Sequence, residues 1–346
     1  MKHQTTRYGE IPFYKIGTFG NTADAFISKK LFLEYKTKYS FPKKGDILIS
    51  ASGTIGRAVI YDGKPAYFQD SNIVWIDNDE TLVKNDFLFY AYSNVKWNTE
   101  HTTILRLYND NFRNTLIPLP PLNEQSAIAN ILSGLDRYLC ALDALILKKE
   151  GVKKALSFEL LSQRKRLKGF NQAWQRVRLG DIANYLTSNL SAEQITQQGK
   201  IKVYDVNNFI GYTDTTFISD KPYISIVKDG SVGRVRILPP KTNILSTMGA
   251  LIANHRTTTE FLFYLLSNFD FKNFTSGSII PHIYFKDYKE KTIFLPPLNE
   301  QNAIANILSA LDNEIASLKN KKRQFENIKK ALNHDLMSAK IRVLKK

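Results

Sequence analysis

The sequence contains a single cysteine, Cys140, and only three methionines and three tryptophans among 346 residues. One cysteine excludes a disulfide bond within the chain and fits a reducing compartment, so we expect a cytoplasmic protein in which Cys140 is a small buried residue. No apolar run approaches the roughly 18 residues of a membrane span. The opening residues, MKHQTTRYGEIPFY, contain no apolar segment of the kind that a secretory signal requires.

Acidic residues are scarce relative to basic ones. The chain has 32 Asp and Glu against 48 Lys and Arg, a formal net charge of +16 and a pI near 9.6. Such an excess of positive charge predicts a polyanionic partner, most often nucleic acid. With 43% apolar and 12% aromatic residues, the rest of the composition is typical of a folded globular protein.

One long segment occurs twice. LPPLNEQSAIANILSGLD begins at Leu119, and LPPLNEQNAIANILSALD begins at Leu295, so sixteen of eighteen positions are identical at an offset of 176 residues. Weaker matches precede both copies at similar offsets. They pair FLFYAYSN with FLFYLLSN, SGTIGRAVI with DGSVGRVRI, and TILRLYNDNF with IIPHIYFKDY. The chain is therefore a duplicated unit, in which a variable region precedes a nearly constant segment.

The variable regions are typical of β-rich structure. Both combine short apolar runs of β-branched residues with Gly turns, and the turn at Asp229-Gly230 is an example. FLFYAYSN and FLFYLLSN predict short helices with Asn85 and Thr259 as N-caps. These features predict an α+β fold with two mixed, β-rich regions, each followed by a long helix.

Each repeated segment opens that helix. Two consecutive prolines precede it, Asn123 and Asn299 are the expected N-caps, and Glu124 and Glu300 suit the positive end of the helix dipole. Apolar residues then alternate at steps of four and three, which predicts a heptad seam and an antiparallel coiled coil between the two helices, related by a pseudo-twofold axis. The expected seam residues are Ile128, Leu132, Leu135, Leu139, Leu142 and Ile146 in the first helix and Ile304, Leu308, Leu311, Ile315 and Leu318 in the second. The alternative is that each helix packs on the core of its own globular region.

Several segments together resemble those of a known protein family. They are the two PPLNEQ copies with their helices, KKAL at 153–156 and 329–332, and LLSQRKRLKGF before WQRVRLGDIANY. SGSIIPHIYFKDY and TTILRLYNDNF add to the likeness. In this order they resemble the specificity subunit of a type I restriction–modification system, over essentially the whole chain.

The resemblance implies a subunit that has no catalysis of its own and reads a split target in double-stranded DNA. It implies a first target-recognition domain at 1–118, a central helix at 119–170, a second recognition domain at 171–294 and a C-terminal helix at 295–346. In this family the two helices act as a spacer, and methylation subunits dock on the framework. Two methylation subunits are therefore expected here, and restriction subunits are further candidate partners. No cofactor is expected in this chain, whereas S-adenosylmethionine, ATP and Mg are expected on the partner subunits.

Candidate DNA contacts lie in the segments that correspond between the two regions. A Gly-bounded turn followed by Arg suits phosphate or guanine, although a plain hairpin turn with a solvated Arg is the competing interpretation. Polar residues near the closing motif occupy equivalent positions and could reach bases. The candidates are Ser52, Thr54, Arg57, Asn72, Arg106, Tyr108, Lys228, Ser231, Arg234, Arg236, His282 and Tyr284.

Two further functions remain open from the residues alone. One is a stand-alone DNA-modifying enzyme with cryptic catalysis, and the other is a coiled-coil scaffold that binds only protein. No Asn-Pro-Pro-aromatic motif, dinucleotide fingerprint or P-loop occurs, and the five histidines and one cysteine have no zinc-site spacing. An acid-x-Lys triplet at Glu34–Lys36 is too common to indicate a nuclease. We therefore expect no catalytic residue and no metal ligand.

The two copies differ at their beginnings. The second variable region opens with AWQRVRLGDIANY from Ala173, and the counterpart of Leu179-Gly180 would fall before Met1. We therefore expect the first recognition domain to be short at its N-terminal side, and to be less stable or impaired in reading DNA unless another segment supplies that edge.

Overall fold

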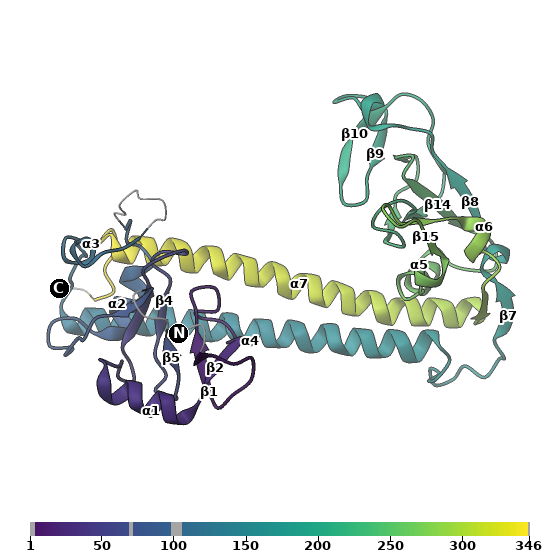
Figure 1. The fold of residues 1–346 in the computed structure, drawn as a ribbon. Coiled ribbons are helices and arrows are strands. Elements are labelled where there is room, and N and C mark those ends of the chain that lie inside the picture. Colours follow the sequence, from purple (N-terminus) through teal and green to yellow (C-terminus); the bar gives the residue numbers. More distant parts are fainter. Residues whose placement is uncertain (1–3, 69–71, 98–105, 345–346) are drawn as a thin grey trace. The chain divides into compact units, whose positions relative to one another are not determined.

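The computed structural model describes residues 4–68, 72–97 and 106–344. Internal contacts divide the chain into two compact units, one of residues 1–143 with 320–346 and the other of residues 144–319. Each unit thus combines one β-rich region with a part of each of two long helices (Figure 1).

The first unit contains two small sheets. One has the strand order β2-β1-β5 and the other β4-β3-β6. The bounds are β1 Ile11–Tyr14, β2 Ala25–Ile27, β3 Ile47–Ser50, β4 Ala58–Ile60, β5 Tyr67–Phe68 and β6 Ile73–Trp75, with helices α1 Lys29–Lys38, α2 Asn85–Tyr92 and α3 Asn109–Arg113. Strand β3 is buried along its whole length because both of its faces pack in apolar clusters: Leu48 lies in one cluster, and Ile47 and Ile49 lie in another with Leu88 of α2.

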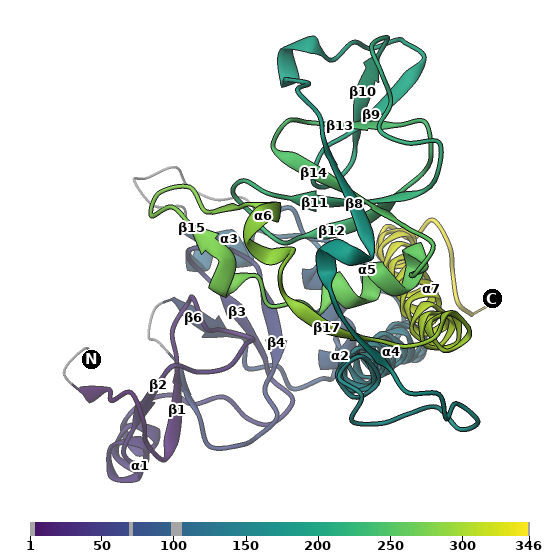
Figure 2. The same cartoon turned by 90° about the vertical axis from the view of Figure 1, so that its right-hand side faces the viewer.

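The second unit is built around a four-stranded antiparallel sheet of order β12-β11-β14-β8 (Figure 2). Smaller sheets have the orders β10-β9-β13, β17-β7 and β15-β16. The bounds are β7 Gln175–Arg178, β8 Ala183–Thr187, β9 Ile201–Tyr204, β10 Phe209–Thr213, β11 Tyr223–Val227, β12 Val235–Leu238, β13 Asn243–Ile244, β14 Met248–Ala253, β15 Thr275–Ser276, β16 His282–Ile283 and β17 Thr292–Leu295. Helix α5 (Thr259–Ser267) packs against the large sheet, and α6 spans Phe285–Tyr288.

The short helices α2 and α5 begin as the sequence predicts, but their N-caps lie one residue earlier than expected. Thr258, not Thr259, caps α5, because its side chain accepts a hydrogen bond from the Phe261 N–H at 3.2 Å. Lys84 is the N-cap of α2, and Asn85 is already inside the helix. The Asn85 side chain instead accepts a hydrogen bond from the Asn78 amide at 2.9 Å, so its polar group serves the preceding loop.

The long helices α4 (Leu122–Leu161) and α7 (Leu298–Met337) each contain 40 residues. Neither Asn123 nor Asn299 is an N-cap, since both lie within the first turn. The first helical hydrogen bonds go to the carbonyl oxygens before the helices, from Gln125 N to Pro121 O and from Gln301 N to Pro297 O, both at 2.9 Å. A proline carbonyl can accept such a bond although its nitrogen has no hydrogen to donate, so the helix starts immediately after the prolines.

A buried glutamine fastens the start of α7 to the β-rich region before it. The Gln301 amide nitrogen donates to Arg256 O and Pro296 O, and its oxygen accepts from Thr257 Oγ1 and Thr258 N, at 2.8–3.0 Å. In the first unit, Gln125 does the same with Leu82 O, Pro120 O and Lys84 N. The Gln of the repeated motif therefore holds the helix start and the loop before α2 or α5 together.

Within each unit, α4 and α7 run antiparallel. In the first unit, Asp136 pairs with Lys329 at 2.5 Å and Asp143 pairs with Lys322 at 2.7 Å, so residue numbers fall along α7 as they rise along α4. In the second unit, Lys149 pairs with Glu314 at 2.8 Å and Lys153 with Asp312 at 2.5 Å.

The expected seam residues are buried or half-buried. The buried ones are Ile128, Leu132, Leu142, Ile146, Ile304, Leu308 and Ile315, and the half-buried ones are Leu135, Leu139, Leu311 and Leu318. At the start of α4, the helix also packs on the core of its own β-rich region, as the alternative interpretation predicted. Ile128 and Leu132 share a cluster with Phe87 and Tyr90 of α2 as well as with Leu336 of α7.

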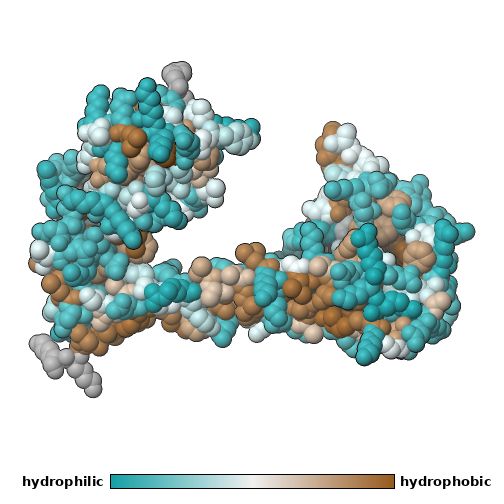
Figure 3. Space-filling model, turned by 90° about the horizontal axis from the view of Figure 1, so that it is seen from below, coloured by the Kyte–Doolittle hydropathy of each residue, from teal (hydrophilic) through white to brown (hydrophobic). Residues whose placement is uncertain are grey.

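Other apolar and sulfur-containing side chains of α4 lie outside the seam. Cys140 is exposed, contrary to expectation, because it lies beside Leu139 and Leu142 rather than at a seam position. In the part of α4 that belongs to the second unit, the helical surface shows hydrophobic patches (Figure 3). Its exposed large apolar residues are Leu145, Leu147, Val152 and Phe158.

Candidate nucleic-acid interface

Each unit places a tight turn between two antiparallel strands, β3–β4 in the first and β11–β12 in the second. Gly53, Gly56, Gly230 and Gly233 in these turns have φ between 66° and 83°, a region that favours glycine. The second glycine of each turn also packs against an aromatic ring, since a Cβ on Gly56 would meet Trp97 and one on Gly233 would meet Phe271. Gly56 and Gly233 are therefore needed so that an aromatic ring can pack closely against the turn, a reason that the sequence pattern did not indicate.

The closing segment of each region joins this turn. Ser52 and Arg106 form a β-bridge, and the Leu107 N–H donates to Ala51 O at 2.8 Å. In the second unit, Asp229 bridges His282, and the Ile283 N–H donates to Lys228 O at 2.9 Å. Residues that are more than fifty positions apart in sequence therefore lie together, and the candidate DNA contacts Ser52, Arg106, Lys228 and His282 belong to these two junctions.

The candidate arginines are partly held by the protein. Arg57 donates from Nη1 to Phe19 O at 2.9 Å, and Arg234 donates from Nη2 to Asn207 Oδ1 at 2.8 Å. Arg236 donates to Asn207 O at 2.8 Å and lies 5.3 Å from the centre of the Tyr204 ring. A guanidinium has five N–H donors in a fixed fork, so each of these side chains keeps donors for a ligand while its position is restricted.

The polar candidates around the junctions differ in how they are held. Ser52 donates to Asn72 Oδ1 at 2.8 Å, and His282 Nδ1 lies 2.7 Å from Asp229 Oδ1. The Arg106 guanidinium lies 5.9 Å from the centre of the Tyr108 ring.

The remaining candidates are mostly open to solvent. Tyr108 is 42% exposed and Tyr284 is 50% exposed, so both rings can meet a ligand. Ser231 is exposed and Lys228 is half-buried. The Thr54 carbonyl accepts a hydrogen bond from the Ser50 hydroxyl.

The β9–β10 hairpin is a feature that sequence reasoning missed. Asn207, at its tip, receives hydrogen bonds from both Arg234 and Arg236. The rings of Tyr204, Phe209 and Tyr212 form a chain with centres 5.1–6.0 Å apart. The available signal was the alternation of aromatic and polar residues in KVYDVNNFIGYT, which is also compatible with an ordinary exposed hairpin.

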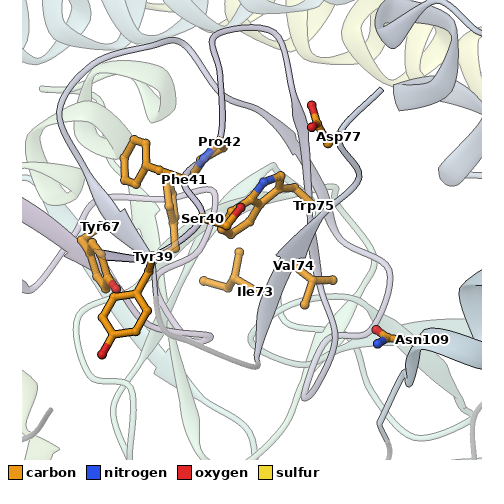
Figure 4. A pocket seen from close by; sticks show the side chains of 11 residues that line it. Tyr39, Ser40, Phe41, Pro42, Tyr67, Ile73, Val74, Trp75, Asp77 and Asn109 are labelled. Carbon is orange, nitrogen blue, oxygen red and sulfur yellow. The ribbon is translucent and has the colours of Figure 1, made fainter. Parts of the chain in front are cut away.

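The first unit carries an open aromatic cavity of about 450 Å³. Figure 4 shows Tyr39, Phe41, Tyr67 and Trp75 around it, with Asp77 at its side. Stacking on such rings is a common way to hold a planar group.

Among the residues that the structure describes, no group of three or more His, Cys, Asp or Glu side chains lies where it could hold a metal ion. Among the same residues, no helix is long and apolar enough to cross a membrane.

A family model matches the chain in two parts. The model of the type I restriction modification DNA specificity domain covers residues 1–149 and again 171–327. The two matched stretches correspond to the two halves of the internal repeat.

Curated relatives carry names that agree with this match. A protein of Haemophilus influenzae, named as a type I restriction enzyme specificity subunit, is 65% identical over 133 residues, which are 38% of this chain and 34% of that protein. The match therefore spans about a third of that relative's length. The MjaX specificity subunit of Methanocaldococcus jannaschii is 28% identical over 335 residues, covering 86% of this chain and 79% of the relative.

Solved structures share the fold. The S subunit of a type I restriction–modification system from M. genitalium superposes with a TM-score of 0.64 at 20% identity, covering 97% of this chain and 91% of the other. A chain from a study of complex assembly and conformational transition in a type I system gives 0.55 at 17% identity, covering 85% and 82%. Because this family model matches most of the chain, in two copies, the chain belongs to the type I restriction modification DNA specificity family.

Proposed function

We propose that this chain is the non-catalytic DNA-reading subunit of a type I restriction–modification complex, acting on double-stranded DNA. The observation that carries the proposal is that each unit joins a Gly-bounded turn carrying an arginine to a closing segment with polar and aromatic residues. Specific readers need side chains that reach base edges as well as cations that neutralise phosphates. The net charge of +16 and the family membership support the same function.

We further propose that the two β-rich regions read different halves of a split target. Their turns and closing segments correspond in position but differ in sequence, with Ser52 and Arg106 in one and Asp229 and His282 in the other. Different side chains at equivalent places select different bases. The helices α4 and α7, which share nearly the same residues in their first turns, read no bases in this proposal and serve as a spacer.

In this proposal, α4 and α7 form one antiparallel coiled coil with a pseudo-twofold axis. The support is a set of equivalent contacts, since Asp136–Lys329 in one unit and Asp312–Lys153 in the other are related by the repeat offset of 176. Tyr90 and Tyr264 also donate to these two aspartates, at 2.7 and 2.9 Å. A helix of 40 residues is about 60 Å long at roughly 1.5 Å per residue, which suits half-sites separated by several unread base pairs.

Methylation subunits, expected as two, are the proposed protein partners, with restriction subunits as further candidates. Methyl transfer and cleavage would take place on them, with S-adenosylmethionine, ATP and Mg bound there. The exposed apolar residues of α4, including Leu147 and Phe158, support a docking role because contiguous apolar surface marks protein interaction sites.

Methylome sequencing of cells that carry this gene with its methylation partner tests the proposal. We expect a split, asymmetric motif, with Arg57→Ala plus Arg106→Ala weakening modification of one half and Arg234→Ala plus His282→Ala that of the other. Lys221→Ala, an exposed lysine outside the junctions, is the control.

Purified complexes provide a second readout. The logarithm of the DNA affinity should fall by about 0.9 per neutralised phosphate for each unit increase in the logarithm of salt concentration. Salt-independent binding with an unchanged methylome would favour a protein scaffold. Methyl transfer by the chain alone would instead favour cryptic catalysis.

A further inference from the structure

Both β-rich regions contain an antiparallel hairpin of the same topology. In the second unit, β9 pairs antiparallel with β10 and parallel with β13 (Figure 2). In the first unit, β1 pairs antiparallel with β2 and parallel with β5. The two hairpins are therefore equivalent elements, and the loops at their tips are residues 15–24 and 205–208.

Each hairpin loop holds the arginine that follows the Gly-bounded turn. In the second unit, Arg234 donates from Nη2 to the side-chain oxygen of Asn207 at 2.8 Å. In the first unit, its counterpart Arg57 donates from Nη1 to the main-chain carbonyl of Phe19 at 2.9 Å. Both arginines are exposed. The two loops thus supply different acceptors for the same arginine of the repeat.

The second arginine of the β12 segment attaches the hairpin loop to the sheet. Arg236 is half-buried, donates to the Asn207 main-chain carbonyl at 2.8 Å and lies over the Tyr204 ring. Its counterpart in the first unit is Val59, which packs beside Gly20 of the hairpin loop, 3.2 Å from where a Cβ would lie. A valine has no charge for a phosphate and no donor for a base, so contact with the loop is what the two positions share.

The loop that carries Asn207 is itself fixed by hydrogen bonds. Asp205 Oδ1 accepts from the N–H groups of Asn207 at 2.7 Å and Asn208 at 2.6 Å, and the Asp205 N–H donates to Asn208 O at 3.0 Å. An aspartate that accepts from the backbone two residues further on stabilises a tight turn. Asn207 therefore presents its side chain from a restrained backbone.

The anchored arginine lies next to the junction described above. The Val227 N–H donates to Arg234 O at 2.9 Å, so Arg234 begins the strand pairing directly after the turn. The other arm of the turn continues from Val227 into Lys228 and Asp229, which contact the closing segment at His282 and Ile283. A base that meets the junction is therefore also close to this arginine.

One anchored nitrogen restricts Arg234 without using up its donors. A guanidinium has five N–H groups in one plane, and among the described residues the Nε and Nη1 groups of Arg234 donate to no protein atom. Bidentate binding of guanine O6 and N7 requires two N–H groups held in a set direction. A phosphate, by contrast, is also bound by lysine as a point charge, so it does not require the anchor. An arginine that is oriented beforehand loses less side-chain freedom when it binds.

We propose that Asn207 is a positioning residue that orients Arg234 to read a guanine. This inference rests on the proposed function. Arg234 makes the bidentate contact with the base, Asn207 fixes its direction, and Arg236 holds the hairpin loop in place and contacts no DNA.

Duplexes built on the split motif of the wild-type methylome, with the chain purified together with its methylation subunits, test this by fluorescence anisotropy. Each guanine is replaced in turn by adenine, and the ratio of the two dissociation constants is the discrimination at that position. At one guanine we expect about tenfold to hundredfold discrimination, the range of a good bidentate pair. Arg234→Lys keeps the charge but lacks the planar fork, so it should abolish discrimination at that guanine alone.

Asn207→Ala isolates the positioning role, because it removes the side-chain acceptor and keeps the carbonyl to which Arg236 donates. Discrimination at the same guanine should fall by about threefold to tenfold, the effect of one hydrogen bond. In the Arg234→Lys background it should not fall further. Asn207→Asp keeps an oxygen acceptor and should restore the discrimination.

Two controls accompany these variants. Asn208→Ala changes the exposed neighbour in the same loop and should leave the discrimination at wild-type level. Asn207→Ala should also leave every guanine of the other half-site unaffected, because Arg57 is held by a main-chain carbonyl of the first unit.

Salt dependence tests the role of Arg236. Arg236→Met, with its folding checked by circular dichroism, should lower the discrimination as Asn207→Ala does. It should leave the slope of log affinity against log salt unchanged, because the loss of a phosphate contact reduces that slope by about 1.

Three results would overturn the inference while the wild-type complex still binds specifically. They are full discrimination at every guanine in Arg234→Lys, additive effects of Asn207→Ala and Arg234→Lys, and a slope reduced by Arg236→Met. A wild-type complex that binds all duplexes equally would instead overturn the proposed function, and this inference with it.

Discussion

At the scale of single residues, the glutamine of the repeated PPLNEQ motif is a buried residue that stabilises the fold, although a polar side chain is usually exposed. Gln301 is fully buried and makes four hydrogen bonds. Gln301→Ala would leave all four partner groups without it, and we expect a loss on the order of 3 kcal/mol in the free energy of unfolding of the second unit. Thermal or urea denaturation measures this, and Asn302→Ala, at the exposed neighbouring position, should stay within about 0.5 kcal/mol of wild type.

The ion pair between Glu124 and Arg342 makes the stability of the first unit depend on pH. The hydrogen bond from Arg342 to Glu124 is the main cause that holds the pKa of this carboxyl below its ordinary value. A carboxyl with a lowered folded-state pKa stabilises the fold above its unfolded pKa, and this stabilisation is lost as the pH falls through the folded pKa. Arg342→Met should therefore lower the melting temperature at neutral pH, and its difference from wild type should shrink below about pH 4. An equal difference at every pH would contradict this origin, and Arg323→Met, on an exposed part of α7, is the control.

At the scale of elements, the two glycines of the β11–β12 turn are needed for different reasons, one for its backbone conformation alone and the other also for the space that a side chain would take. Gly230 has φ 83° with open space around it, whereas Gly233 has φ 80° and lies against the Phe271 ring. Gly230→Ala should cost only the left-handed strain of about 1 kcal/mol. Gly233→Ala adds a steric clash and should cost roughly 1–3 kcal/mol more. Denaturation of the two matched variants compares them, and similar losses would show that the ring moves aside freely.

The two long helices are elements that could be predicted from the sequence. The period of the apolar residues predicted both long helices, and the predicted seam residues are buried or half-buried along them. Their N-caps were wrong because a proline carbonyl accepted the first hydrogen bond, and Asn123 remained inside the first turn. Local side-chain preference identifies a helix start only to within a residue or two.

At the scale of the whole molecule, the proposed spacer can be lengthened without changing either reader. Seven residues inserted after Asp143 in α4, and seven before Lys322 in α7, keep the heptad period on both sides of a native ion pair. The insertion adds about 10 Å at roughly 1.5 Å per residue, and DNA rises about 3.4 Å per base pair. Methylome sequencing should then find the same half-sites about three base pairs further apart. Inserting into α4 alone should abolish modification, and an unchanged gap in the double insertion would contradict the spacer role.

The sequence by itself determined the duplication, the two long helices, the positive charge and the family, because periodicity, composition and repeated segments are local properties of the chain. Only the tertiary structure decided which distant segments meet. The junctions of Ser52 with Arg106 and of Asp229 with His282, the anchoring by Gln301, and the pairing of β7 with β17 all depend on contacts across long stretches of chain. Such pairing is selected by the packing of whole elements, and no local pattern of residues encodes it.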